Sequence, residues 1–327
     1  MKPTPLAVAL ITLLAATPSL AQDSIEDIID DAREKVKDDL RNSDIGAGYA
    51  QMLNFFVDPS ISASRLDTDA EDTRYEVYKL PLLYAFPAND GEWQLVVRGT
   101  LSHANAENEF SIIDGEIIDG AIIDGTWEAD SALFGIGALV PAGENLSWFV
   151  GGQLGISRLE NEADYRGELS EFLAPILDGV LFNWDTNARI SSLTGGLDYH
   201  TQFADKYDVT LNGRYTHSHI ASYSESRDLQ SFSEDTGTLA ASADIEHPWG
   251  ASLGDVPLFG VARLGATAFT GPSRKALGFS HFYSLGYSVG LDVAERSRYF
   301  EGLTLGAQYN FGKDVDGFSL VFGWQLK

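Results

Sequence analysis

The chain has 327 residues, of which 44% are hydrophobic, and its formal net charge at pH 7 is -26. So acidic a chain lacks the basic face that nucleic-acid binding requires. Because there is no cysteine, disulfide bridges, thiolate metal sites and lipid attachment to a cysteine are excluded. The apolar content is too high for a disordered chain.

The first 21 residues have the features of a secretory signal peptide. Lys2 precedes an apolar run over residues 6–16, and the small residues Ser19 and Ala21 match the pattern that signal peptidases recognise. The run is shorter than the roughly 20 residues that a membrane-spanning helix needs. We therefore expect residues 1–21 to be removed. Since no later apolar run is long enough for such a helix, a membrane protein read from this chain must be a closed β-barrel.

Apolar and polar residues alternate along many later segments, which is typical of β-strands. The clearest case is the last one, where large apolar residues occupy every second position from Phe318 to Leu326, separated by residues such as Ser319 and Gly323. Twelve segments follow this pattern: 61–67, 75–86, 93–103, 128–140, 146–157, 187–200, 207–218, 237–246, 256–269, 281–294, 302–311 and 317–326.

The connections between these segments alternate between short and long, which is typical of the periplasmic turns and extracellular loops of outer-membrane barrels. A soluble β-sandwich or lipocalin-like barrel would also alternate, but its apolar face points inward. Here the opposite face is small or polar, with no second apolar surface. We therefore expect an all-β, antiparallel transmembrane barrel over residues 61–327, located in the bacterial outer membrane.

Residues 22–60 form a separate N-terminal segment that contains a predicted amphipathic helix. Ile25, Ile28, Ile29, Val36 and Leu40 recur at helical spacing. The other face is acidic, and its candidates for contact with the barrel are Asp27, Asp31, Glu34 and Asp38. One interpretation leaves this helix in the periplasm or against a partner.

The second interpretation places the helix inside the barrel. Four basic residues have inward parity on the predicted strands: Lys79, Arg98, Arg214 and Arg263. Arginines in a narrow channel require counter-charges, and twelve strands should leave space for one helix. We hypothesise that the acidic helix lies in the lumen against these residues, whereas the alternative is that Asp198, Asp244 and Asp292 neutralise them.

Residues 24–327 resemble the translocator β-domain of autotransporters, especially the solitary barrels that lack a passenger. The resemblance rests on the helix before twelve strands, the stretch Tyr78 to Tyr84, and a glycine-bearing last strand with Phe322, Gly323, Trp324 and Leu326. It implies that the helix threads the pore and that the last strand is read by the barrel-assembly machinery, with periplasmic chaperones acting during biogenesis. About 40 residues between Ala21 and the first strand are too few for a passenger.

Catalytic and metal-binding patterns are weak. His103, His217, His219 and His281 lie near predicted extracellular strand ends, but the hydroxyl of Ser218 has the opposite parity to its histidine neighbours. The repeat of Ile-Ile-Asp-Gly over residues 112–125 differs from the nonapeptide calcium repeat, and a structural role for its turns is favoured. We expect no enzyme, no cofactor and no metal site.

The predicted function is a plugged outer-membrane barrel with a structural or interaction role. The alternatives are a porin-like diffusion channel for small solutes and, third, a lipid-processing enzyme. We expect a monomer whose partners are outer-membrane lipids and lipopolysaccharide.

Overall fold

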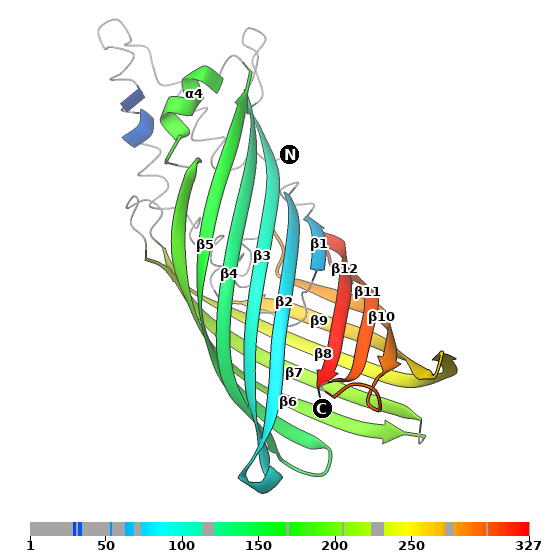
Figure 1. Ribbon diagram of the computed structural model, residues 1–327. Coiled ribbons are helices and arrows are strands. Elements are labelled where there is room, and N and C mark those ends of the chain that lie inside the picture. The colour runs from blue at the N-terminus through cyan, green and yellow to red at the C-terminus, as the bar shows by residue number, and fades with distance from the viewer. Residues whose placement is uncertain are drawn as a thin grey trace, which may run out of the picture.

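The computed structural model forms a closed antiparallel barrel of twelve strands, each hydrogen-bonded to its neighbours in the sequence, with β1 pairing β12 to close it (Figure 1). It describes residues 29–30, 32–34, 53, 63–68, 73–112, 121–167, 170–180, 182–204, 206–223, 232–271, 278–298 and 300–326. The predicted number of strands, their order and the fold class are confirmed.

The strands are β1 (Ala63–Thr68), β2 (Thr73–Ala88), β3 (Trp93–Ile112), β4 (Ala121–Pro141), β5 (Leu146–Arg166), β6 (Trp184–Phe203), β7 (Tyr207–Ser222), β8 (Ser233–Leu253), β9 (Val256–Thr270), β10 (His281–Asp292), β11 (Phe300–Phe311) and β12 (Val315–Leu326). The short 3-10 helix η1 (Asn89–Gly91) connects β2 to β3, and the helix α4 (Ser170–Leu177) lies between β5 and β6. Among the described residues, no helix has both the length and the apolar character needed to cross a membrane.

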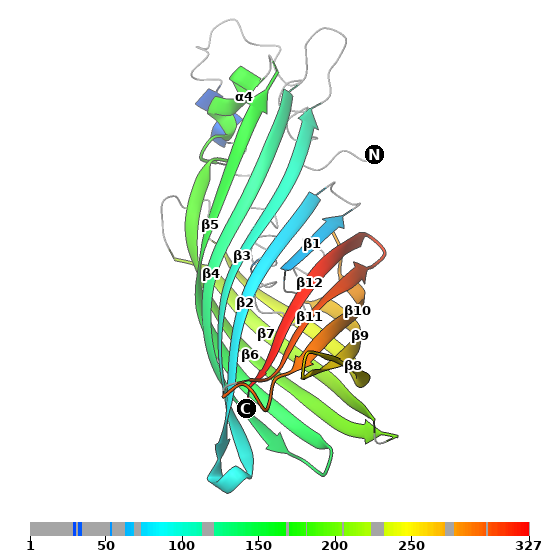
Figure 2. The same cartoon turned by 45° about the vertical axis from the view of Figure 1, so that its right-hand side comes forward.

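The two ends of the barrel differ in the length of their connections. Short turns join β2 to β3, β4 to β5, β6 to β7 and β8 to β9 at what we call the turn end, which also holds the C-terminus (Figures 1 and 2). The long β3–β4, β5–β6, β7–β8 and β9–β10 connections lie at the opposite loop end with α4, together with the short β1–β2 and β11–β12 connections. This asymmetry is that of outer-membrane barrels, in which the loop end faces the cell exterior.

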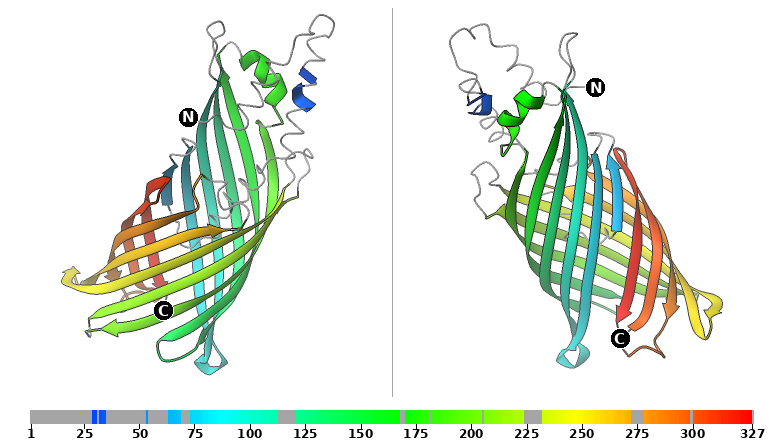
Figure 3. Two further views of the ribbon diagram at one scale, coloured as in Figure 1. Left: turned by 180° about the vertical axis from the view of Figure 1, so that it is seen from behind. Right: turned by 45° about the horizontal axis from the view of Figure 1, so that its top comes forward.

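Strands β3, β4 and β5 are longer than predicted, and one wall of the barrel therefore rises above the other (Figure 3). The third Ile-Ile-Asp-Gly repeat was expected to form a turn. Instead Asp124 and Gly125 lie within β4, where they pair with Asp164 and Ala163 of β5, and Ile123 is buried. The preference of Asp-Gly for a turn is outweighed here by backbone pairing of β4 with both β3 and β5.

The outer face of the barrel carries large apolar side chains that are exposed in the isolated chain. Leu154 is 70% exposed, Leu320 64% and Leu305 63%, values that make sense only for side chains in contact with lipid. On the outer face, Trp249 near the turn end of β8 donates a hydrogen bond to the hydroxyl of Tyr287 of β10 at 2.8 Å. The two polar aromatic groups thus satisfy each other on the lipid-facing surface.

The inner face is not uniformly polar, contrary to the expectation from the sequence. A hydrophobic cluster fills the loop end of the lumen, where β1, β2, β9, β10 and β12 contribute Leu66, Val77, Phe269, Phe282 and Val315. Hydroxyl pairs line the barrel wall, such as Ser192 with Ser218 at 2.9 Å and Thr194 with Thr216 at 2.9 Å. The expectation failed because the inward apolar residues are interspersed with small and polar ones along each strand, so that they do not form a continuous pattern.

Candidate functional site

Two of the inward arginines are ion-paired with aspartates of the barrel wall. Arg214 of β7 donates to Asp198 of β6, with Nη2 2.6 Å from Oδ1. Arg263 of β9 donates to Asp244 of β8, with Nη2 2.9 Å from Oδ2. Asp244 and Arg263 lie directly opposite each other, and Asp198 and Arg214 lie diagonally across adjacent strands. The barrel wall itself therefore supplies the counter-charges that these arginines require.

Arg98 lies against an aromatic side chain of the barrel wall. Its guanidinium carbon lies 4.9 Å from the ring centroid of Phe149, and that of Arg214 lies 4.8 Å from the same ring. Phe149 is 4% exposed, and both distances are within the range of cation–π contacts. Sequence reasoning missed Phe149, although a large aromatic residue between the small inward residues Ser147 and Gly151 is a signal that could have indicated it.

The described part of the N-terminal helix lies at the loop end of the barrel. Residues 29–30 and 32–34 are helical, and Arg33 donates through Nη1 to the carbonyl oxygen of Pro175 at 2.9 Å and through Nη2 to that of Asp178 at 2.9 Å. Figure 1 shows this helical piece beside α4 at the loop end. The lumen arginines Arg98, Arg214 and Arg263 belong to strands β3, β7 and β9.

The predicted helix-contact residues are therefore not brought together in the described part of the chain. Glu34 is exposed. Asp27, Asp31 and Asp38 lie outside the described residues. Lys79 is half-buried with inward parity on β2.

A different residue of the N-terminal segment enters the lumen. Leu53 is 0% exposed and belongs to the hydrophobic cluster at the loop end, together with Leu66 and Val77 of the first two strands. The sequence offered little signal for this contact, because Leu53 is not part of the predicted helix. The N-terminal segment thus contacts the barrel through an apolar anchor in the lumen and a hydrogen-bonded arginine at α4.

Five apolar residues of the segment around α4 are buried: Leu173, Ile176, Leu177, Val180 and Phe182. Tyr165, near the loop end of β5, donates its hydroxyl hydrogen to Oδ1 of Asp178 at 2.8 Å. The pKa of this tyrosine is raised above its usual range, mainly by burial and secondly by the hydrogen bond to Asp178. This connection is therefore anchored to the barrel, and it can serve as a support for Arg33.

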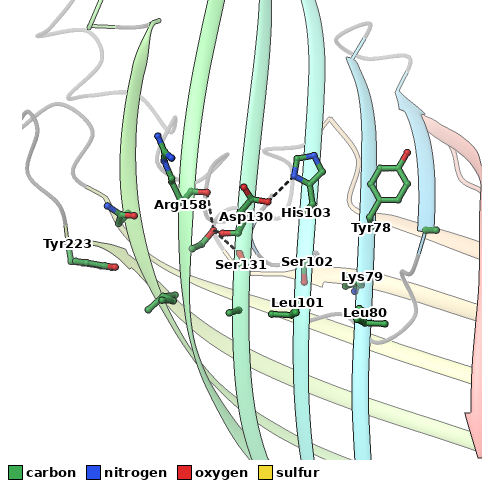
Figure 4. Close-up of a pocket in the computed structure, with 15 residues that line it drawn as sticks. Tyr78, Lys79, Leu80, Leu101, Ser102, His103, Asp130, Ser131, Arg158 and Tyr223 are labelled. Atoms are coloured by element: carbon green, nitrogen blue, oxygen red, sulfur yellow. Dashed lines mark hydrogen bonds and ion pairs between the residues drawn. The ribbon is translucent and has the colours of Figure 1, made fainter.

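A shallow hollow of about 730 Å³ lies on the outside of the barrel toward the loop end (Figure 4). Tyr78, His103, Asp130 and Arg158 follow one another in a single row across β2, β3, β4 and β5, and Nδ1 of His103 lies 3.0 Å from Oδ1 of Asp130.

This row marks the border of the apolar band. On its turn-end side lie the exposed side chains of Leu80, Leu101 and Ile156. On its loop-end side lie Glu128 and Glu160, which are paired across β4 and β5. Such a change from leucine and isoleucine to carboxylates within two residues is typical of the point where a strand leaves the membrane. We assign no ligand to the hollow.

Ser218 and its flanking histidines lie on different faces of β7, as their parity predicted. Ser218 is 0% exposed and bonded to Ser192 in the lumen wall. His217 and His219 are exposed on the outer face and share Asp235 of β8, whose Oδ1 lies 3.5 Å from Nε2 of His217 and 3.1 Å from Nδ1 of His219. Ser218 is therefore not the partner of either histidine. Within the described ranges, no group of three or more His, Cys, Asp and Glu residues could hold a metal ion.

The residues predicted as an assembly signal all lie on β12. Phe322 is exposed on the outer face, with its ring 5.5 Å from that of Trp324. Gly323 faces Thr304 of β11, whose hydroxyl oxygen would lie 2.6 Å from an added Cβ. Leu326 pairs with Phe300 at the turn end. The last strand is thus paired on both edges, to β11 and β1.

Residues 58–325 match the family model described as the solitary outer membrane autotransporter beta-barrel domain. The chain belongs to this family. It is an outer-membrane protein of the autotransporter type, as the resemblance implied, and the family describes a membrane barrel rather than an enzyme. No curated protein matches the chain in sequence.

Several solved structures are similar to this solitary autotransporter barrel. The β domain of the Bordetella autotransporter BrkA has a TM-score of 0.48 and 15% identity, covering 80% of this chain and 94% of its own. The translocator domain of the autotransporter NalP from Neisseria meningitidis has a TM-score of 0.40 and 15% identity, covering 87% and 98%. The CymD monoaromatic hydrocarbon channel has a TM-score of 0.39 and 10% identity, covering 79% and 75%.

Proposed function

We propose that this barrel is a plugged autotransporter-type domain without a passenger, which serves a structural or interaction role in the outer membrane. The observation that carries the proposal is Leu53, a residue of the N-terminal segment that is fully buried in the hydrophobic cluster of the lumen. A leucine buried among apolar side chains contributes about 1.5–3 kcal/mol, enough to hold one point of the segment in the lumen.

The plug of this proposal comprises residues 22–60, after removal of residues 1–21. It is held by Leu53 within the lumen and by Arg33 at the carbonyl oxygens of Pro175 and Asp178. Contact between the acidic face of the helix and the lumen arginines is not required, since Arg214 and Arg263 have partners in the wall. For Asp27, Asp31 and Asp38 it remains a prediction.

Single-channel recording in planar bilayers tests the plug. We expect the full-length processed protein to conduct little. Deletion of residues 23–42 and the substitution Leu53→Asp should each raise the conductance, because the first removes the part that reaches α4 and the second places a charge in an apolar cluster. Leu53→Met is the matched control, since methionine has nearly the same volume, and it should stay closed.

The second candidate is a porin-like diffusion channel, which the polar lumen wall around Thr194 and Thr216 supports. A porin would conduct as purified, with no increase on deletion of residues 23–42. That result would reject the plug. Lipopolysaccharide, membrane lipids, the barrel-assembly machinery and periplasmic chaperones remain the proposed partners, and we propose a monomer.

A further inference from the structure

Three adjacent strands bring a serine, a histidine and an aspartate into one row on the outer face of the barrel. Ser191 of β6 lies directly opposite His219 of β7, and His219 lies directly opposite Asp235 of β8. Nδ1 of His219 is 3.1 Å from Oδ1 of Asp235. That hydrogen bond orients the ring and leaves Nε2 available as a base.

The hydroxyl of Ser191 is within reach of the histidine. Its Oγ donates a long hydrogen bond to the carbonyl oxygen of His219 at 3.4 Å. Directly opposite residues of an antiparallel pair have Cβ atoms about 4.5–5.5 Å apart. With the ring of His219 held by Asp235, rotation about χ1 of Ser191 turns Oγ toward the imidazole. Catalytic hydrogen bonds of this kind are often longer before substrate binds.

A groove of about 520 Å³ on the lipid-facing surface has Ser191, His217 and His219 among its lining residues. The rest of its outward lining is apolar or lacks a side chain: Phe134, Ile136, Gly152, Leu154 and Leu193. Gly152 forms the low point between these side chains, because a glycine leaves no side chain over the β5 backbone. A groove with apolar walls and one polar end fits an acyl chain with its ester group at that end.

The polar end of the groove lies where lipid ester groups are found. On the turn-end side of the row, Leu193, Tyr215 and Leu239 are exposed to lipid. On the loop-end side, the outer face carries Arg189, which lies 4.6 Å from the ring of Tyr223. The row therefore lies at the border between apolar and polar surface, where the acyl esters of the outer leaflet meet water.

We propose that Ser191, His219 and Asp235 form a serine hydrolase site that cleaves acyl esters of outer-leaflet lipids. Oγ of Ser191 attacks the ester carbonyl carbon while Nε2 of His219 takes the hydroxyl proton. The bond between that carbon and the alkoxy oxygen then breaks, and His219 returns the proton to the leaving lipid alcohol. Water, activated by His219, attacks the acyl-serine ester, which releases a fatty acid and restores the Ser191 hydroxyl.

Two other groups have assigned roles in this proposal. Asp235 positions the ring of His219 and compensates its positive charge after proton transfer. His217, two residues from His219 on the same face of β7 and 3.5 Å from Asp235, is the donor that meets the developing negative charge on the carbonyl oxygen. This activity is independent of the plug, since none of its residues contributes to the lumen.

The test uses full-length protein folded in detergent, an alkyl fluorophosphonate probe and mixed micelles of phosphatidylethanolamine. We expect the probe to label Ser191, identified by peptide mass spectrometry, and fatty acid to be released. Ser191→Ala should abolish labelling, and His219→Ala should reduce the rate at least about 100-fold. Heat-modifiable migration in gels verifies that each variant is folded.

Two matched variants separate catalysis from a general effect on the barrel. Ser218→Ala removes a hydroxyl from the lumen face of β7, the strand that carries His219. His103→Ala breaks the outward His103–Asp130 pair, in which the residue opposite the histidine on β2 is Tyr78 and not a serine. Both should keep labelling and hydrolysis unchanged. Absence of labelling in the folded wild-type protein, or labelling that persists in Ser191→Ala, would overturn the proposal.

Discussion

Arg214 and Asp198 form an ion pair between adjacent strands inside the barrel, with Nη2 of the arginine 2.6 Å from Oδ1 of the aspartate. Their side chains are 18% and 20% exposed, so the pair is largely shielded from water. The same guanidinium lies against Phe149 and donates through Nη1 to the carbonyl oxygens of Leu197 and Gly213, but Asp198 supplies its counter-charge.

Asp198→Asn should destabilise the folded barrel, because it leaves the charge of Arg214 uncompensated. We expect a loss of about 1–3 kcal/mol in the free energy of unfolding, below the value for a fully buried pair because some water reaches the site. Urea unfolding from lipid vesicles measures it. Asp255→Asn breaks the exposed pair with Arg296 and should have little effect; equal effects of the two substitutions would contradict the prediction.

Gly196 and Gly195 of β6 should differ sharply in their tolerance of alanine. A Cβ on Gly196 would lie 2.2 Å from the carbonyl oxygen of Gly213 and 2.6 Å from Cδ of Arg214, whereas one on Gly195 meets nothing within 4 Å. Gly196→Ala should therefore lower the free energy of unfolding by about 1–3 kcal/mol. Gly195→Ala should stay within about 0.5 kcal/mol of the wild type. The same urea titration distinguishes them, and a neutral Gly196→Ala would refute the predicted clash with the carbonyl oxygen of Gly213.

A charged residue on the lipid face should lower the free energy of unfolding more at mid-strand than near the turn end. Leu305, in the middle of β11, and Phe203, at the end of β6, are 63% and 68% exposed. Leu305→Lys should destabilise the barrel by about 2–4 kcal/mol and Phe203→Lys by about 0–1 kcal/mol, following the depth of each residue in the bilayer. Unfolding from vesicles gives both values, and the reverse order would refute the assigned membrane position.

Signal peptidase should cleave the exported chain after Ala21, so that the mature protein begins at Gln22. The mass of the protein purified from outer membranes checks this directly. Ala21→Asp should block cleavage, because the recognition pocket takes small residues. An unprocessed wild-type chain in the outer membrane would refute the prediction.

The strand pattern could be predicted only within the membrane. Between the turn end and the border row of His103 and Asp130, lipid on one side and a channel on the other impose a period of two on each strand. Beyond that border, carboxylates such as Glu128 and Glu160 replace the apolar outer face, while inward residues such as Leu159 are buried in the hydrophobic cluster. The apolar-outward pattern of the membrane segment therefore ends there. For this reason the extensions of β3, β4 and β5 toward the loop end were missed, and Asp124-Gly125 was assigned to a turn.

The candidate sites depended on which residues face each other across strands. Parity predicted that Ser218 faces away from its histidine neighbours, and it gave Arg214 and Arg263 an inward position without showing their partners Asp198 and Asp244. It could not show that Ser191 lies opposite His219, or that Asp235 faces both His217 and His219, since these residues are far apart in the sequence and meet only when the strand register is set.

The sequence alone determined the membrane barrel, its twelve strands and its lipid face, because each follows from the local alternation of side chains along a strand. The tertiary structure decided which aspartates pair with the lumen arginines and where Leu53 is buried. It also decided which residues of different strands face each other on the outer surface, as Ser191, His219 and Asp235 do. These depend on register and barrel closure, which are properties of strand pairs and not of single strands.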